Sequence, residues 1–265
     1  MGEARRRRIE PGQCIFCGNV GNLTKQHVFP DWLNAYNPEK VTHHAVRTGR
    51  FSARNDPLIP GLRQGSLGVQ KKRKVCATCN NGWISRIENK TKPCLVDLMQ
   101  GNKKEITPGE AESISALLGI ISVTAEHMGP REKLAIGEED RTYIMENETL
   151  PPYWKVFAVK YNGVNEKFTY LRHVTLAFLR YSDIFRNPTL RDFPPNAKVT
   201  QILIGSFCSI VFSFRHPREI PYHKSVRRLW PASEAIDWER APTVGDPGLI
   251  RFLDSAVESF HGMKA

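Results

Sequence analysis

Two pairs of cysteines have the spacing of metal-binding turns. Cys14 and Cys17 form one Cys-x-x-Cys pair, and Cys76 and Cys79 form the other. Such a turn presents two thiolates on one side of a tight loop, with the sulfurs roughly 4 Å apart, as tetrahedral Zn–S bonds of about 2.3 Å require. Two such turns complete a four-thiolate shell, which suits structural Zn²⁺. The sequence therefore predicts a structural zinc site, and the alternative is four unrelated buried cysteines.

The remaining features fit a reducing compartment. Cys94 and Cys208 stand alone, and the N-terminus carries four arginines with no apolar segment behind them. That pattern does not match a secretory signal, so we expect a cytoplasmic protein without disulfides. The longest apolar-rich stretch, residues 202–214, is interrupted by Gly and Ser and is shorter than the roughly 18 residues of a membrane helix. No membrane partner is predicted.

A second set of polar residues lies around the cysteine pairs. The stretch Gln26-His27-Val28-Phe29-Pro30 lies between the pairs, Asn80 follows Cys79 directly, and Asn89 comes nine positions later. In this order the residues resemble the HNH (ββα-metal) endonucleases, in particular the zinc-stabilised branch with two Cys-x-x-Cys pairs. The resemblance covers residues 13–92, about a third of the chain.

The resemblance implies a metal-dependent endonuclease that hydrolyses DNA phosphodiester bonds. His27 would be the general base, since an imidazole near neutral pKa suits proton abstraction from water. Asn80 and Asn89 would complete the catalytic set. Gln26 and Asn80 would help to hold a catalytic Mg²⁺ or Mn²⁺, cations that prefer oxygen ligands.

One residue departs from the family pattern. The family usually has Asp or Glu immediately before the histidine, and this chain has Gln26. An amide oxygen can bind the cation, but more weakly than a carboxylate; Glu88, beside Asn89, is a candidate to compensate. The alternative function is therefore a non-catalytic, zinc-stabilised nucleic-acid-binding protein. His27 as a structural histidine and Asn80 as a helix cap are the corresponding alternatives for single residues.

The interval between the two asparagines limits their geometry. Nine positions along a helix correspond to about 900°, a net half turn. Asn80 and Asn89 can therefore converge only if Asn80 lies in the turn before the helix proper.

The positive charge is concentrated in the first third of the chain. Residues 1–92 contain 17 Lys and Arg against 6 Asp and Glu, and residues 93–265 contain 21 of each, so the first part accounts for the whole net charge of +11. This asymmetry favours a polyanionic partner, DNA or RNA. The candidate phosphate-binding residues are Lys71, Lys72, Arg73 and Lys74, and Arg5, Arg6, Arg7 and Arg8 in the N-terminal arm. Either cluster could instead be a solvated charge run.

The surrounding pattern predicts the elements that position these residues. We expect a β-hairpin of residues 41–51 and 67–75, followed by a helix after Cys79. Pro93 either interrupts this helix or starts the next one. Thr107, Pro108 and Glu110 have the pattern of a capping box at the start of another helix. Further expected elements are a short helix at 138–146, strands at 154–161 and 168–179 joined by an Asn162-Gly163 hairpin turn, strands at 198–204 and 207–214, and a tail helix from Asp246.

The expected fold class is α+β. A basic flexible arm (1–12) precedes an N-terminal ββα-metal (HNH) zinc module (13–92), and helices with a mainly antiparallel sheet form an accessory domain (93–265). That domain would contribute substrate recognition or contact a second copy or a partner protein. The family's usual settings suggest a phage or anti-phage defence assembly.

Overall fold

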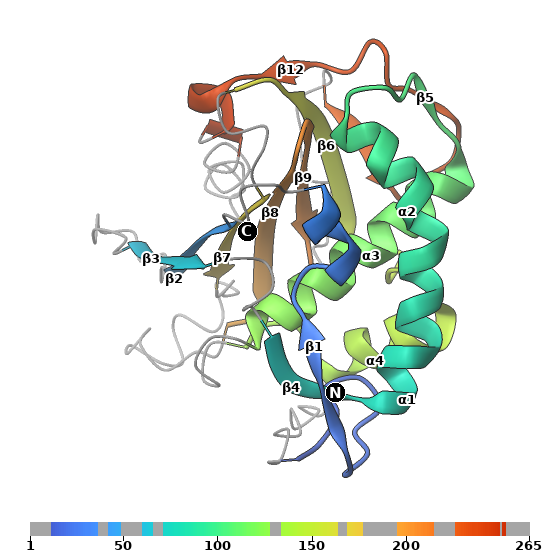
Figure 1. Cartoon of the computed structure of the whole chain (residues 1–265), viewed down its shortest axis with the longest axis vertical. Helices are drawn as coiled ribbons and strands as arrows, with labels where there is room; N and C mark the ends of the chain where they lie inside the picture. Colours follow the sequence, from blue (N-terminus) through green and yellow to red (C-terminus); the bar gives the residue numbers. More distant parts are fainter. Residues whose placement is uncertain are drawn as a thin grey trace, which may run out of the picture.

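The structure is a computed structural model that describes residues 12–36, 42–48, 60–65, 71–127, 134–163, 169–176, 195–214, 226–249 and 251–252 (Figure 1). The helices and helical turns are η1 (Asp31–Ala35), α1 (Ala77–Cys79), η3 (Asn80–Ile84), α2 (Ser85–Met99), α3 (Pro108–Glu126) and α4 (Glu138–Asn147). The first strands are β1 (Leu23–His27), β2 (Thr42–Thr48), β3 (Pro60–Gly65), β4 (Lys71–Cys76), β5 (Glu105–Ile106) and β6 (Lys155–Tyr161). The later strands are β7 (Thr169–Leu176), β8 (Ala197–Ile204), β9 (Phe207–Phe212), β10 (Arg227–Trp230), β11 (Ile236–Asp237) and β12 (Thr243–Val244).

Within the described residues, one large sheet forms the centre of the fold. Its strand order is β10-β6-β9-β8-β7-β2-β3, and β12 pairs with β6 at one end. The β2–β7 and β6–β12 pairs are parallel, and the other pairs in this sheet are antiparallel. A mixed α/β protein with a mainly antiparallel sheet was expected, and this part of the expected fold class is confirmed.

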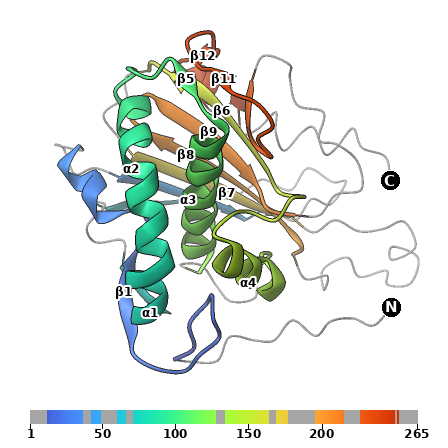
Figure 2. The ribbon, with the colours of Figure 1, turned by 90° about the vertical axis from the view of Figure 1, so that its right-hand side faces the viewer.

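The helices α2, α3 and α4 lie on one side of the large sheet (Figure 2). The innermost is α3, which contacts β9 and β10 on one side and α2 on another. All of its residues from Ile114 to Glu126 are buried, including two serines, Thr124 and Glu126. A helix that is buried on all sides must be covered by other elements, and the sheet, α2 and α4 provide that cover.

The predicted start of α3 is confirmed. The Thr107 hydroxyl accepts a hydrogen bond from the N–H group of Glu110, and the Glu110 carboxylate accepts one from the N–H group of Thr107. Two N–H groups that the helix leaves without partners are thereby satisfied. The short helix expected at 138–146 is also present, as α4.

A two-stranded antiparallel ribbon, β1 with β4, leads into the helical layer (Figure 1). Leu23 pairs with Cys76 at one end of the ribbon, and His27 pairs with Lys71 at the other. The register shifts between Thr24 and Lys25, where the strands bulge. The chain continues from β4 through α1 and η3 into α2, with a kink at Gly82, whose ψ of −110° is not helical.

The expected hairpin of residues 41–51 and 67–75 is wrong. β2 pairs with β3 (60–65) and with β7, whereas β4 pairs with β1. Both segments are strands, but strand pattern does not specify the partner. β1 had been read only as a motif-bearing segment, so its pairing with β4 was missed.

The expected hairpin at Asn162-Gly163 is wrong as well. In the sheet, β9 and β8 lie between β6 and β7. Gly205, at a positive φ of 57°, lies in the tight turn that joins β8 to β9. The N–H group of Asn162 donates instead to the carbonyl of Val244 in β12. The Asn-Gly pair therefore does not join β6 and β7 as neighbours, because the β8–β9 hairpin lies between these two strands in the sheet.

Pro93 does not interrupt the helix, because α2 runs unbroken from Ser85 to Met99. A proline deprives the carbonyl four residues earlier, here that of Asn89, of its helical donor. Both Pro93 and Asn89 are exposed, so water can satisfy that carbonyl.

One apolar cluster joins the two parts of the chain. Phe16 and Trp83, from the cysteine-bearing segment, belong to the same buried cluster as α3 and residues of the large sheet such as Val211. The boundary predicted after residue 92 falls inside α2. Division into separate folding units at this point stays a prediction.

Candidate metal centre and the polar site around His27

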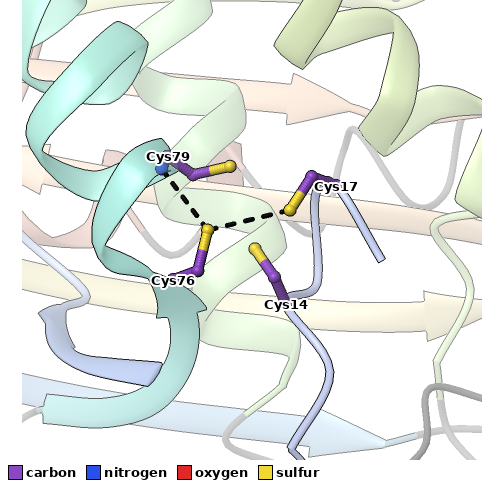
Figure 3. Close-up of side chains that lie close together, drawn as sticks. All are labelled: Cys14, Cys17, Cys76 and Cys79. Carbon is purple, nitrogen blue, oxygen red and sulfur yellow. Dashed lines mark hydrogen bonds between the residues drawn. The ribbon is translucent and has the colours of Figure 1, made fainter. Parts of the chain in front are cut away.

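The four paired cysteines converge in space. Their Sγ atoms all lie within 4.8 Å of one another, and the sulfurs of Cys17 and Cys76 are 3.7 Å apart (Figure 3). Zn–S bonds of about 2.3 Å in tetrahedral geometry place sulfurs roughly 4 Å apart. The sulfur spacing fits a tetrahedral ion, and the cluster could hold a structural metal such as zinc.

Local backbone geometry places each pair. In the first turn, the N–H group of Gly18 donates to the carbonyl of Cys14, and Gly18 itself adopts a φ of 71°, which favours glycine. In the second, Cys76 ends β4 and caps α1, so that its sulfur accepts from the N–H group of Cys79 at 3.5 Å. The N–H group of Ile15 donates to the carbonyl of Lys74 at 2.9 Å and joins the two turns.

The thiols differ in their electrostatic surroundings. Burial raises the pKa of Cys17 and Cys79 above the usual value of a thiol. Burial also acts to raise the pKa of Cys76, but hydrogen bonds from the Cys79 N–H group and from neighbouring thiols outweigh it, and the pKa of Cys76 is lowered. A cation bound between the sulfurs would compensate the charge of the thiolates and so offset the effect of burial on Cys17 and Cys79.

The cysteine turns are anchored in the core. Arg141 of α4 is 4% exposed, and its Nε donates to the carbonyl of Ile15 at 2.7 Å while Nη1 donates to the carbonyl of Ile136. Phe16, between Cys14 and Cys17, packs edge-to-face on Trp83 with ring centroids 5.0 Å apart. The metal centre is thereby held against the helical layer.

His27 lies at the end of β1, away from the cysteines. Its Nδ1 is 3.0 Å from Oδ1 of Asp31, the first residue of η1. The same Oδ1 accepts a hydrogen bond from Nδ2 of Asn34 at 3.0 Å. The His27 side chain is mostly buried, at 14% exposed, and that of Asp31 is 77% exposed. The turn that starts at Pro30 brings a carboxylate to the imidazole.

Helix α2 contributes a second carboxylate to this site. Burial, and then the negative charge of Asp31, raise the pKa of Glu88 to about 7. Lys92, one turn further along α2, lies over the Trp32 ring at 5.6 Å from its centroid. The same side of α2 therefore faces η1, and the Glu88 carboxylate lies close enough to Asp31 to feel its charge.

Gln26 is buried without a hydrogen-bond partner for its oxygen. The residue is 4% exposed, and Oε1 has no partner within the described part of the chain. A buried acceptor without a partner is costly, on the order of 1–3 kcal/mol, and this oxygen could therefore accept from a water or bind a cation.

The asparagines of the expected site are placed differently. Asn80 is half-buried at the end of α1, directly after Cys79, and Asn89 is exposed on α2. His27 is at the other end of the β1–β4 ribbon from Cys76, about 13 Å along the strand by its four-residue separation from Leu23. The convergence of His27 with Asn80 and Asn89 stays a prediction.

The basic residues of β4 lie next to this site along the backbone. Lys71 pairs with His27 and Lys72 with Gln26, and Arg73 is exposed. The arginines of the N-terminal arm, Arg5, Arg6, Arg7 and Arg8, lie outside the described residues, so their role in binding stays a prediction.

Asp31 is the site residue that sequence reasoning did not single out. A four-residue separation from His27 indicates contact only if the chain turns between them. Pro30 was read as part of the family motif rather than as the start of that turn.

The comparisons leave the family open. No family model, no curated protein and no solved structure matches this chain. In the part of the chain that the structure describes, no helix has both the length and the apolar character that crossing a bilayer requires.

The raised pKa of Glu88 predicts a pH-dependent stability. The folded state holds the Glu88 proton up to about pH 7, against an ordinary value of 4.5, so this stabilisation is complete below pH 4.5 and is lost as the pH rises through 7. The Glu88→Gln variant carries no group that loses a proton at this position, so its stability should not fall in this way. The difference in the free energy of unfolding, variant minus wild type, should therefore rise between pH 4.5 and pH 7 by up to about 3 kcal/mol.

Urea titrations across that range would measure the effect. Glu146→Gln, an exposed change on α4, is the matched control and should give a difference that varies little with pH. A flat difference for Glu88→Gln would contradict the raised pKa of Glu88.

Proposed function

We propose that this chain is a metal-dependent endonuclease of the HNH type that hydrolyses DNA phosphodiester bonds. The observation that carries the proposal is the order β1–β4–α2 around a four-cysteine cluster, with a mostly buried histidine at the end of β1 beside the Asp31 carboxylate. The four-cysteine cluster and the β1–β4 ribbon that leads into α2 support this proposal.

The donor set supports a hard divalent cation. Gln26 offers a buried oxygen without a partner, and the Asp31 and Glu88 carboxylates supply the negative charge that Gln26 lacks. Mg²⁺ and Mn²⁺ prefer such oxygen ligands. These three residues would hold the cation, which would stabilise the charge that develops on the phosphate and the leaving oxygen.

His27 would accept the proton of the attacking water. Its Nδ1 lies 3.0 Å from Oδ1 of Asp31, a carboxylate that would stabilise the imidazolium formed when the ring takes up this proton. Arg73, with Lys71, Lys72 and Lys74 of the same strand, would contact the phosphate backbone, which gives affinity without sequence preference.

The direct test is nicking of supercoiled plasmid. Protein that retains its zinc is dialysed into metal-free buffer without chelator and then given Mg²⁺ or Mn²⁺. Nicked circles should accumulate only with the added cation. A parallel reaction on single-stranded RNA distinguishes the two nucleic acids as substrates. The absence of nicking under all these conditions, with DNA binding intact, would favour the alternative function, a zinc-stabilised nucleic-acid-binding protein.

Gln26→Glu separates the two functions more sharply. A carboxylate at this position adds a charged ligand, and charge-assisted contacts contribute about 1.5–3 kcal/mol. The cation concentration for half-maximal nicking should therefore fall roughly tenfold, with an equal or higher maximal rate. A protein that only binds nucleic acid should instead bind DNA more weakly and produce no nicks.

Gln100→Glu is the matched control for this experiment. It adds the same charge at the exposed C-terminal end of α2. Its cation dependence should equal that of the wild type. An identical response of both variants would show that the added charge, and not its position, changes the reaction.

A further inference from the structure

A lysine and an arginine lie directly opposite each other on the β1–β4 ribbon. Lys25 of β1 pairs with Arg73 of β4, and both residues are exposed. Residues paired in this way project from the same face of an antiparallel ribbon, with Cβ atoms about 4.5–5.5 Å apart. Among the described residues, no carboxylate lies within ion-pair distance of either side chain. Two positive charges are thus held next to each other without an acidic partner in this part of the chain.

The backbone on both sides of this pair is fixed by hydrogen bonds. The register between the strands shifts beside Lys25, so that Lys74 has no residue opposite it. The carbonyl of Lys74 accepts from the N–H group of Ile15 in the first cysteine turn at 2.9 Å. The hydroxyl of Thr24 donates to the carbonyl of Val75, also at 2.9 Å. These bonds tie the ribbon to the metal centre and oppose the separation of the strands that would relieve the repulsion.

The pair lies on the same face of the ribbon as His27. Side chains two positions apart on a strand share a face, and Lys25 and His27 are about 7 Å apart along β1. Gln26, between them, is 4% exposed on the opposite face. Like charges directly opposite each other destabilise a ribbon. An anion that both side chains contact removes this cost, and the oxygens of one phosphate can accept from both.

We propose that Lys25 and Arg73 form a phosphate clamp, in which both cations bind one backbone phosphate of a DNA duplex on the ribbon face that carries His27. The guanidinium supplies a planar fork of donors, and the ammonium supplies a compact charge beside it. The choice of DNA as the ligand rests on the proposed function. Lys25 is then a binding residue from outside the basic run at 71–74, and binding relieves a repulsion that is present in the free protein.

The first experiment measures the affinity of the full-length, zinc-loaded protein for a short fluorescein-labelled DNA duplex, without added Mg²⁺ or Mn²⁺. Lys25→Gln and Arg73→Gln should each weaken binding about three- to tenfold at about 0.1 M salt. In the double variant, the slope of log K against log salt concentration should become shallower by about 0.9, the value for one phosphate. A change of about twice that size would mean that each cation binds its own phosphate, which would overturn the clamp.

The second experiment separates the repulsion from the binding. Lys25→Glu places a carboxylate opposite Arg73, so its melting temperature should equal that of the wild type or exceed it by up to about 3 °C. The same variant should bind the duplex at least about tenfold more weakly. Lys104→Glu is the matched control, because it makes the same charge change at an exposed position just before β5, at the end of α2 away from the ribbon (Figure 1). Its affinity should fall by less than about threefold.

The outcomes separate the clamp from the proposed function. A wild type that binds the duplex but does not nick plasmid contradicts the enzyme proposal, and the affinities still decide whether the clamp exists. Equal affinities of Lys25→Glu and Lys104→Glu would overturn the clamp, as would a wild type that does not bind the duplex. A Lys25→Glu protein that melts clearly below the wild type would overturn it too, because the two cations would then not repel each other in the free protein.

Discussion

Replacing His27 with alanine is expected to lower the rate of metal-dependent plasmid nicking by about a hundred- to ten-thousandfold. The range is the usual contribution of a general base, and alanine offers no other proton acceptor at this position. The structure gives a reason to expect a folded variant, because the His27 side chain contacts the exposed Asp31 and lies at the far end of the β1–β4 ribbon from the cysteine cluster.

Three measurements make this result interpretable. The zinc content and melting temperature should equal those of the wild type, and the dissociation constant for plasmid or a duplex should change by less than about threefold. The loss would then belong to the chemical step. Equal nicking by the wild type and His27→Ala, with DNA binding intact, would mean that the nicking has another source and that the enzyme proposal is wrong.

Removal of the structural metal is expected to unfold the chain rather than to inactivate it selectively. Binding of zinc to four thiolates contributes on the order of 10 kcal/mol in small modules. A protein of this size has a net stability of about 5–15 kcal/mol. Cys79→Ser should therefore lose its zinc and melt far below the wild type, with loss of the near-ultraviolet circular dichroism of the buried tryptophans.

Cys94→Ala is the matched control for this change. Cys94 is also buried, at 5% exposed on α2, but it lies outside the cysteine cluster. This variant should keep one zinc per chain, measured with a chromogenic chelator. Its free energy of unfolding should fall by no more than about 1–2 kcal/mol. A Cys79→Ser protein with wild-type melting temperature would contradict a structural role for the site.

The metal ligands could be predicted because their signal is short-range. The spacing within each Cys-x-x-Cys turn fixes the distance between two sulfurs, and only the meeting of the two turns needed the fold. The start of α3 was predictable for the same reason, since Thr107 and Glu110 interact across a single turn.

The strand partners could not be predicted in this way. Residues 67–75 and 154–161 have clear strand patterns, but alternation of polar and apolar side chains does not encode which strand lies next to them. β4 pairs with β1, which lies between the cysteine pairs, and β8 and β9 separate β6 from β7. These pairings depend on how whole layers pack. So does the contact of Lys92 in α2 with the Trp32 ring in η1.

The link between Arg141 and the first cysteine turn constrains the two segments unequally during evolution. Both acceptors of the Arg141 guanidinium are main-chain carbonyls, of Ile15 and Ile136. Every amino acid carries such a carbonyl, so the hydrogen bond places no demand on the side chains at 15 and 136. Only the arginine is irreplaceable in it, since lysine lacks the planar fork. Relatives of this chain could therefore change the side chains at 15 and 136 without loss of this contact, whereas the helix must keep its arginine.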